Sequence, residues 1–162
     1  MLWIGLRDGG ITADLFVRAP SLPLDLALGL GGGVVVALSW QLIASFVGPV
    51  GALERELAAR IGPLTTSEAL GLALLSGVGE ELFFRGAMQP SLGLVGTTLL
   101  FAIVHSGPSK IYLVWTLFAL LGGLGLGSLF EWRQNLMAPI VAHVAVNAIG
   151  LGRLSRGSLE RF

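Results

Sequence analysis

Long apolar runs dominate this chain and leave few ways for it to fold. Residues 24–47 and 111–130 are examples, since each can supply the roughly 20 residues that a helix needs to cross a bilayer. Charged residues make up 12% of the sequence, against about 25% in a typical soluble domain. The mean hydropathy is +0.82. The sequence therefore predicts an all-α membrane protein that folds as a compact multi-helix bundle.

Turn residues and charged stretches divide the apolar runs into about five predicted transmembrane helices. The segment from Glu54 to Gly62 is short and charged, and we expect it to lie at the membrane interface with Leu53, Leu57 and Ile61 facing inward. Thr65 and Glu68 have the spacing of a helix start, and Pro90 is expected to stop the helix that follows. The predicted spans are Leu24–Val47, Thr65 to about Met88, Leu92–His105, Ile111–Phe130 and Leu136–Leu151.

Glycines and basic residues predict how these helices pack and are oriented. Glycines gather at 29–33 and again at 122–127, where small residues would let neighbouring helices approach closely. Arg7, Arg18 and Arg133 fall on the amino-terminal side of the predicted spans, whereas most other basic residues fall on the opposite side. The positive-inside rule then places the carboxy terminus in the cytoplasm and the amino terminus outside.

Several function classes are excluded by composition. The formal net charge is +0, which gives no electrostatic reason to expect a nucleic-acid partner. The chain has no cysteine, so disulfides, thiolate metal sites and a cysteine nucleophile are ruled out. It also lacks the His-Glu-x-x-His motif of zinc proteases and the Gly-x-Ser-x-Gly motif of serine hydrolases.

Strongly polar residues are rare inside the predicted spans, which makes them candidates for function. Glu81 and Arg85 are four residues apart and are expected to pair on one helical face. His143 and Asn147 share a face of the last span in the same way. The candidate site residues are Glu80, His105, His143 and Asn147, with Glu81 and Arg85 in support.

These residue types together can hydrolyse an acyl compound, most naturally a peptide bond. A carboxylate and two imidazoles can activate a water molecule, either directly or around a metal ion. An amide side chain and an imidazole N–H can stabilise the oxyanion of a tetrahedral intermediate. If a metal such as zinc is used, its ligands would be Glu80, His105 and His143.

Other interpretations of the same residues stay open at this point. Glu81 and Arg85 can form a purely structural ion pair, and a single histidine in an apolar helix is often only hydrogen-bonded to a carbonyl. A proton-coupled transporter or channel could use Glu80 and the histidines as a relay. A non-catalytic membrane scaffold would tolerate the loss of Glu80.

Three short motifs on separate predicted helices resemble those of the CPBP family, the CAAX-protease and bacteriocin-processing (ABI) intramembrane proteases. They are Glu80-Glu81-Leu82-Phe83-Phe84-Arg85-Gly86, Phe101-x-x-x-His105 and His143-x-x-x-Asn147. The resemblance divides the chain into an interfacial lead-in (1–23), a first transmembrane helix with an amphipathic connector (24–66), a CPBP-like protease core (67–152) and a tail (153–162).

The resemblance implies a glutamate-type intramembrane endopeptidase. Glu80 would be the general base with His105 assisting, and His143 and Asn147 would form the oxyanion site. Glu81 and Arg85 would orient the segment that holds Glu80. No cofactor is favoured, although a divalent metal is an alternative. The implied partners are the lipid bilayer and a membrane-anchored protein or peptide substrate, and the implied location is a prokaryotic inner membrane.

Overall fold

The computed structural model describes residues 13–16 and 21–159 of the chain. In these ranges it contains helices and no strand, so the predicted all-α bundle is confirmed. The interfacial lead-in predicted for 1–23 falls mostly outside the described residues, as do Arg7, Arg18 and Arg161. The short helix α2 (Ala13–Phe16) precedes the bundle.

The first predicted span and the connector after it both form helices. Helix α3 runs from Leu22 to Phe46, and Val47 then takes an extended conformation that ends it. Helix α4 (Gly48–Ile61) follows as the amphipathic connector. Of its predicted inward stripe, Leu53 is fully buried, whereas Leu57 and Ile61 are half-buried. The stripe therefore faces the bundle most strongly at its first position.

The middle of the chain contains two helices that follow one another directly and meet at a kink. Helix α5 (Thr66–Glu81) begins with a capping box, in which Thr65 and Glu68 each bond the other's backbone N–H, as the sequence predicts. A π-helical segment, η1 (Leu82–Met88), leads directly into α6 (Gln89–Val104). The prediction that Pro90 stops the helix is wrong. Pro90 lies just after η1, and the helix continues past it as far as Gly93.

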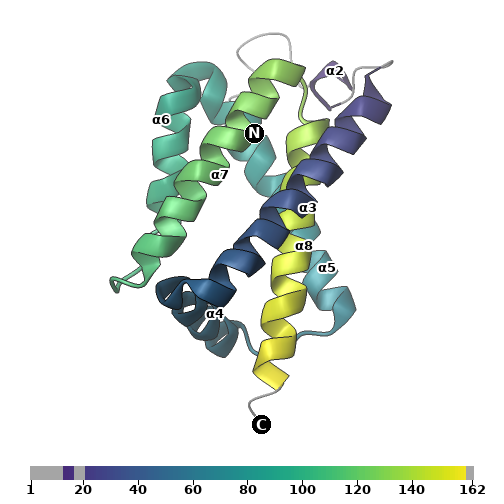
Figure 1. Cartoon of the computed structure of the whole chain (residues 1–162). Coiled ribbons are helices and arrows are strands. Elements are labelled where there is room, and N and C mark those ends of the chain that lie inside the picture. The colour runs from purple at the N-terminus through teal and green to yellow at the C-terminus, as the bar shows by residue number, and fades with distance from the viewer. Residues whose placement is uncertain (1–12, 17–20, 160–162) are drawn as a thin grey trace.

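The chain instead changes direction at a glycine. Gly93 has a φ of 68°, a conformation that glycine adopts without strain, and it breaks the helical geometry within α6. Figure 1 shows α6 lying beside α7 after this turn. Four helices in the described residues are long and apolar enough to cross a membrane, and the one at Thr66–Val104 contains two of the five predicted spans.

The last two helices form a hairpin. Helix α7 (Tyr112–Arg133) ends at Gln134, which adopts the left-handed conformation with a φ of 56°. Helix α8 then runs from Met137 to Leu159. The predicted end of this helix at Leu151 is wrong, because the helix continues to Leu159, within the segment that the sequence predicts as a tail.

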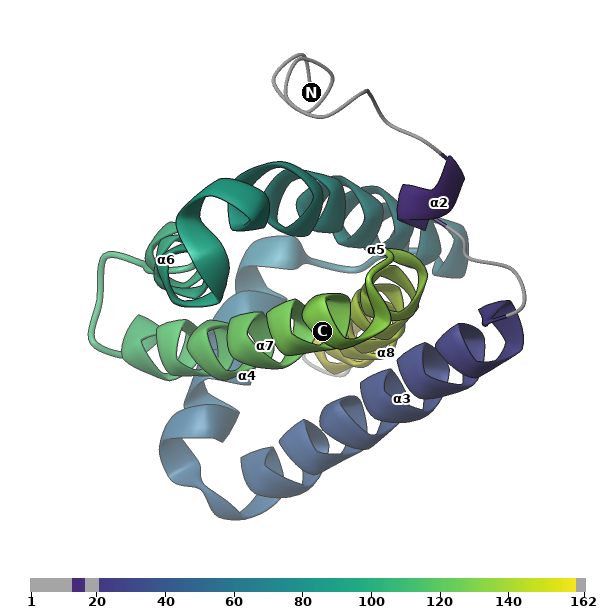
Figure 2. The same cartoon turned by 90° about the horizontal axis from the view of Figure 1, so that it is seen from above.

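Helix α8 packs between α3 and α5 near the centre of the bundle (Figure 2). On α3, a methyl group added to Gly33 would lie 2.6 Å from the carbonyl oxygen of Ala142. On α5, a methyl group at Gly77 would lie 2.7 Å from Val144 Cγ2. By contrast, Gly31 and Gly32 face open space. Only part of the predicted glycine face on α3 therefore serves close packing.

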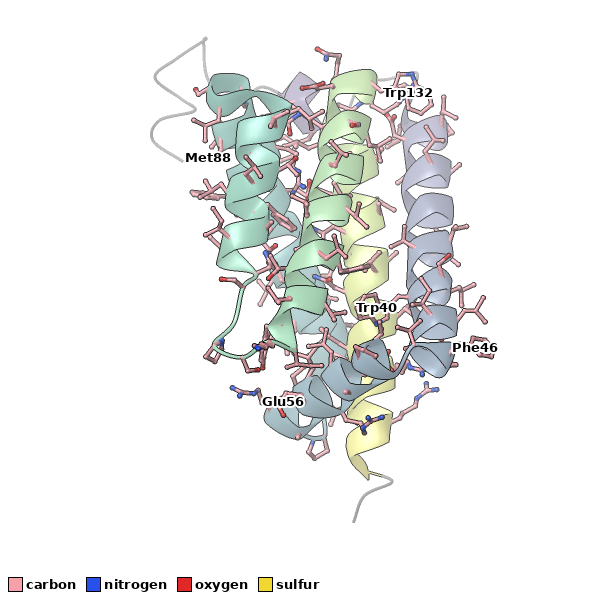
Figure 3. All side chains as sticks on the ribbon, turned by 60° about the vertical axis from the view of Figure 1, so that its left-hand side comes forward. Trp40, Phe46, Glu56, Met88 and Trp132 are labelled. Atoms are coloured by element: carbon pink, nitrogen blue, oxygen red, sulfur yellow. The ribbon has the colours of Figure 1, made fainter. Side chains whose placement is uncertain are left out.

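The outer surface of the bundle is apolar between two polar ends. Phe46 is 82% exposed and points away from the helices (Figure 3). Trp132 and Glu56 lie at opposite ends of the bundle in the same view. This distribution matches a protein whose sides contact lipid and whose ends contact water.

Candidate active site

Three helices bring Glu80 and both histidines to one place. Glu80 lies in the last turn of α5, His105 directly follows α6, and His143 lies on α8. Glu80 Oε2 is 3.6 Å from His105 Nε2 and 3.8 Å from His143 Nε2. The structure thus gathers three of the four residues that the sequence proposes for catalysis.

Hydrogen bonds to the other ring nitrogens fix how each histidine presents itself to Glu80. His105 Nδ1 is 2.7 Å from the carbonyl oxygen of Phe101, and His143 Nδ1 is 2.7 Å from Glu81 Oε1. Because a carbonyl or carboxylate oxygen can only accept, each Nδ1 carries a hydrogen. In the neutral rings, both Nε2 atoms therefore face Glu80 with a lone pair.

When both rings are neutral, Glu80 Oε2 and the two Nε2 atoms are three hydrogen-bond acceptors that face one another with no hydrogen between them. Glu80 Oε2 is shielded from the surface and has no hydrogen-bond partner among the described residues, although the Glu80 side chain as a whole is 30% exposed. Contacts of 3.6 and 3.8 Å are longer than direct hydrogen bonds and suit a bridging water. A water molecule there could donate to the carboxylate and to one imidazole.

Glu81 and Arg85 form the predicted ion pair beneath this group. Arg85 Nη1 donates to Glu81 Oε1 at 2.8 Å, and both side chains are buried. Arg85 Nη2 also donates to the carbonyl oxygen of Gly123 on α7, at 3.1 Å. Arg85 lies on η1, and π-helical segments occur frequently at functional sites. The pair therefore connects the end of α5 to α7.

Sequence reasoning missed that Glu81 also binds His143. The spacing of Glu81 and Arg85 reveals their contact on one helix, whereas His143 lies 62 positions further along the chain. No local pattern in the sequence links Glu81 to His143. The carboxylate that was expected to brace its own helix also orients a candidate catalytic imidazole on another one.

Asn147 is the fourth candidate, and it contacts a residue that sequence reasoning did not select. Its Nδ2 donates to Ser76 Oγ at 2.9 Å. Ser76 lies on α5, one turn before Glu80, and this spacing is the signal that could have identified it. Asn147 itself lies one turn after His143 on α8.

Aromatic rings enclose the side of the site that faces α6. Phe101 is buried, and its ring centroid lies 4.3 Å from that of His105. The guanidinium carbon of Arg85 lies 4.7 Å from the centroid of the same ring. Phe101 therefore separates the Arg85 cation from the His105 imidazole and keeps this side of the site apolar.

The donors of the site do not match a metal centre. Among the described residues, no group of three or more His, Asp and Glu side chains is arranged to hold a metal ion. Glu80, His105 and His143, the metal ligands that the sequence suggests, approach one another only as the pairs Glu80–His105 and Glu80–His143, at 3.6 and 3.8 Å.

Comparison with known proteins identifies the family. Residues 62–149, more than half of the chain, match the family model described as type II CAAX prenyl endopeptidase Rce1-like. The uncharacterized protein YpbD of Bacillus subtilis (strain 168) is 35% identical over 80 residues, which cover 48% of this chain and 41% of YpbD. The match thus spans less than half the length of that relative. No solved structure matches the chain significantly.

The chain therefore belongs to the type II CAAX prenyl endopeptidase Rce1-like family of membrane proteases, and the CPBP resemblance is confirmed. Together with its four apolar helices, this membership makes it an integral membrane protein.

Proposed function

We propose that this family member is an intramembrane endopeptidase that uses a glutamate-activated water to hydrolyse a peptide bond in a membrane-anchored protein or peptide. The observation that carries the proposal is the convergence of Glu80 Oε2 with His105 Nε2 and His143 Nε2, at 3.6 and 3.8 Å. A carboxylate beside the lone pair of a neutral imidazole, in an apolar bundle, forms a site that binds water and removes its proton.

In the proposed reaction, the Glu80 carboxylate accepts a proton from the bound water while the water oxygen attacks the scissile carbonyl carbon. The carbonyl π electrons move to the carbonyl oxygen and form an oxyanion. The Glu80 carboxyl then gives its proton to the leaving amine as the C–N bond breaks. His105 supports Glu80 by accepting a hydrogen bond from the same water.

The oxyanion would be stabilised by donors on α8. The Asn147 amino group has two hydrogens, of which Ser76 accepts one. The second hydrogen is available for the oxyanion. His143 Nε2 becomes a donor only when its ring carries both protons, and the Glu81 carboxylate at Nδ1 suits that doubly protonated ring.

The proposal is tested by replacing Glu80 with its uncharged isostere. Glu80→Gln keeps the shape of the side chain and removes the base, so we expect cleavage to fall by a factor of about 10² to 10⁴. The measurement is the set of new amino termini in membranes of a bacterial host that makes either the wild-type protein or the variant. The substrate identified in this way is then tested for cleavage by the purified protein in liposomes.

Glu56→Gln is the matched control. Glu56 is half-exposed on α4, where it pairs with Arg60, so the same substitution should leave cleavage unchanged. Full activity of Glu80→Gln would refute the proposed mechanism. If no cleavage is found and a pH-dependent ion flux appears in the same liposomes, the site serves transport instead of hydrolysis.

Metal dependence is tested separately on the purified protein. If the glutamate mechanism holds, we expect the rate of cleavage to be unchanged by a chelator and independent of the amount of bound zinc. A loss of activity in chelator that is restored by Zn²⁺, with about one metal ion per chain, would instead assign Glu80, His105 and His143 as ligands.

A further inference from the structure

Helices α5 and α8 face each other through two polar contacts that are one helical turn apart. Ser76 contacts Asn147 in the first, and the Glu80 and Glu81 pair contacts His143 in the second. The chain positions rise along α5 as they fall along α8, so the two helices are antiparallel here. The Ser76 contact therefore belongs to the same face as the site, although Ser76 itself takes part in no step of the proposed reaction.

Close packing holds the two contacts in register. Gly77 and Val144 lie between them, and a methyl group on Gly77 would lie 3.0 Å from the backbone nitrogen of Val144. The backbones of α5 and α8 therefore approach so closely here that not even a methyl group fits between them. This close approach places Ser76 opposite Asn147.

The hydrogen bonds of the Ser76 hydroxyl determine which end of the Asn147 amide faces it. The Ser76 hydroxyl has one hydrogen, and its oxygen lies 2.7 Å from the carbonyl oxygen of Leu72 and 3.4 Å from that of Ala73. Both carbonyls can only accept, so the hydroxyl hydrogen points to the backbone of α5. Ser76 Oγ then has only lone pairs to offer, and Asn147 must present its amino group.

We infer that Ser76 is a positioning residue that fixes the orientation of the Asn147 side-chain amide. The role of this orientation in catalysis rests on the proposed function, whereas the orientation itself does not. With the amino group held on the α5 side, its second hydrogen stays available for an oxyanion. Rotation of the amide by a half turn would present the carbonyl oxygen in its place and repel the negative charge.

The chain contains an internal reference for this inference. Asn135 and Asn147 are its two asparagines. The Asn135 amide is buried and donates to Asp25 and to the carbonyl oxygen of Arg133, while its oxygen accepts from the backbone of Met137. Asn135 is thus held by contacts that do not involve Ser76.

The test uses the full-length protein in detergent micelles, labelled with ¹⁵N in the asparagine side chains. Two NH₂ pairs appear in the NMR spectrum, and Asn147→Ala assigns one of them by removing it. Ser76→Ala should change the chemical shifts of the Asn147 pair and speed its hydrogen exchange about 2- to 10-fold, the factor that one net hydrogen bond provides. The Asn135 pair should stay in place.

Two further substitutions separate the hydroxyl from the shape of the side chain. Ser76→Thr keeps a hydroxyl that can bond the preceding turn, and it should preserve the wild-type Asn147 signals. Ser76→Val has nearly the same shape without a hydroxyl, and it should reproduce Ser76→Ala. If Ser76→Ala unfolds the protein, the Asn135 signals move as well, and the Thr and Val pair decides the question.

Ser45→Ala is the control for a serine without this role. Ser45 Oγ donates to the carbonyl oxygen of Gln41 four residues earlier, as Ser76 does to Leu72, but on an exposed face of α3. It should leave both asparagine pairs unchanged. Asn147 signals that are the same in Ser76→Val as in Ser45→Ala would overturn the inference.

Cleavage kinetics then test the catalytic part. Ser76→Ala should lower kcat about 2- to 10-fold with little change in KM, and it should have no further effect in an Asn147→Ala background. An equal additional loss in that background would show that Ser76 acts independently of Asn147 and would refute the positioning role. If the wild-type protein cleaves nothing, the proposed function fails, and the NMR result still decides the orientation.

Discussion

Two fully buried carboxylates, Asp25 and Glu81, are each paired with an arginine, yet their surroundings differ. Asp25 lies near the start of α3 and accepts hydrogen bonds from Arg133, Ser21 and Asn135, which together use both of its oxygens. Asn135 also accepts from the backbone N–H of Met137 at the start of α8. The Asp25 cluster therefore ties α3 to the loop between α7 and α8.

Glu81 is less completely bonded. Its Oε1 accepts from Arg85 and contacts His143, whereas its Oε2 is buried without a partner among the described residues. It also lies next to Glu80, whose own Oε2 has none. A buried polar group with unused capacity is costly for stability, and such groups cluster where function requires them. Asp25 therefore contacts only residues of the fold, whereas Glu81 also contacts His143, a residue of the candidate site.

The largest expected effect comes from deleting each carboxylate. Glu81→Ala should lower the free energy of unfolding by about 3–5 kcal/mol, because it leaves Arg85 buried without its partner. Asp25→Ala should lower it by less, because the Arg133 side chain is 13% exposed. Denaturant titration of the protein in mixed micelles measures this loss. Cleavage per folded molecule should fall only in Glu81→Ala, and an equal fall in Asp25→Ala would end the distinction between the two clusters.

The amide isosteres sharpen the same comparison. Asp25→Asn and Glu81→Gln keep the side-chain shape and remove the charge, so each should cost about 1–3 kcal/mol of stability. Glu81→Gln should also reduce kcat, because the His143 ring loses the carboxylate that orients it. A double-mutant cycle of Glu81→Gln with His143→Ala tests this coupling, which should vanish if Glu81 acts only through Arg85.

Glycine substitutions test whether the site needs the close approach of α5 and α8. Gly77→Ala should lower stability by about 1–3 kcal/mol and reduce cleavage, since the added methyl group would lie 2.7 Å from Val144. Gly71 is the matched control on the same helix, because its added methyl group meets nothing within 4 Å. Gly71→Ala should leave the protein unchanged or slightly more stable, and the same result for Gly77→Ala would contradict the packing described here.

The smallest effect is expected far from both carboxylates, at the capping box of α5. Thr65→Ala removes the hydroxyl that accepts from the backbone N–H of Glu68, and it should cost about 1 kcal/mol. Thermal unfolding measures this loss. Cleavage should stay at the wild-type level, so a large fall in activity would show that the site depends on the start of α5 as well as on its end.

Much of the helical layout could be predicted because it depends on local properties. Hydropathy placed the first span at 24–47, where α3 occupies Leu22–Phe46, and cap residues placed the start of α5. The same local rules failed at Pro90 and at the end of α8. Proline usually breaks a helix in its interior, yet the helix that leaves η1 continues past Pro90 as far as Gly93. The end of α8 depends on its packing against α3, α4 and α5, which local sequence does not reveal.

The candidate site was likewise predictable only in its local features. The residue types and motif spacings of Glu80, His105, His143 and Asn147 were enough to select them and to suggest water-activating chemistry. Their spacing within each helix also predicted the Glu81–Arg85 pair, because i and i+4 side chains meet on any helix.

What the sequence alone determined is therefore the helices, the polar residues within them and the family. Tertiary structure decided that Glu81 binds His143, that Ser76 faces Asn147 and that Asp25 secures the start of α8. It also decided that Gly33 packs against α8, whereas the neighbouring Gly32 does not. Except for the local bond between Asn135 and Met137, these contacts join residues that are 62 or more positions apart in the sequence. They depend on which faces of two helices meet, and that choice is made by packing across the whole bundle, which no local pattern encodes.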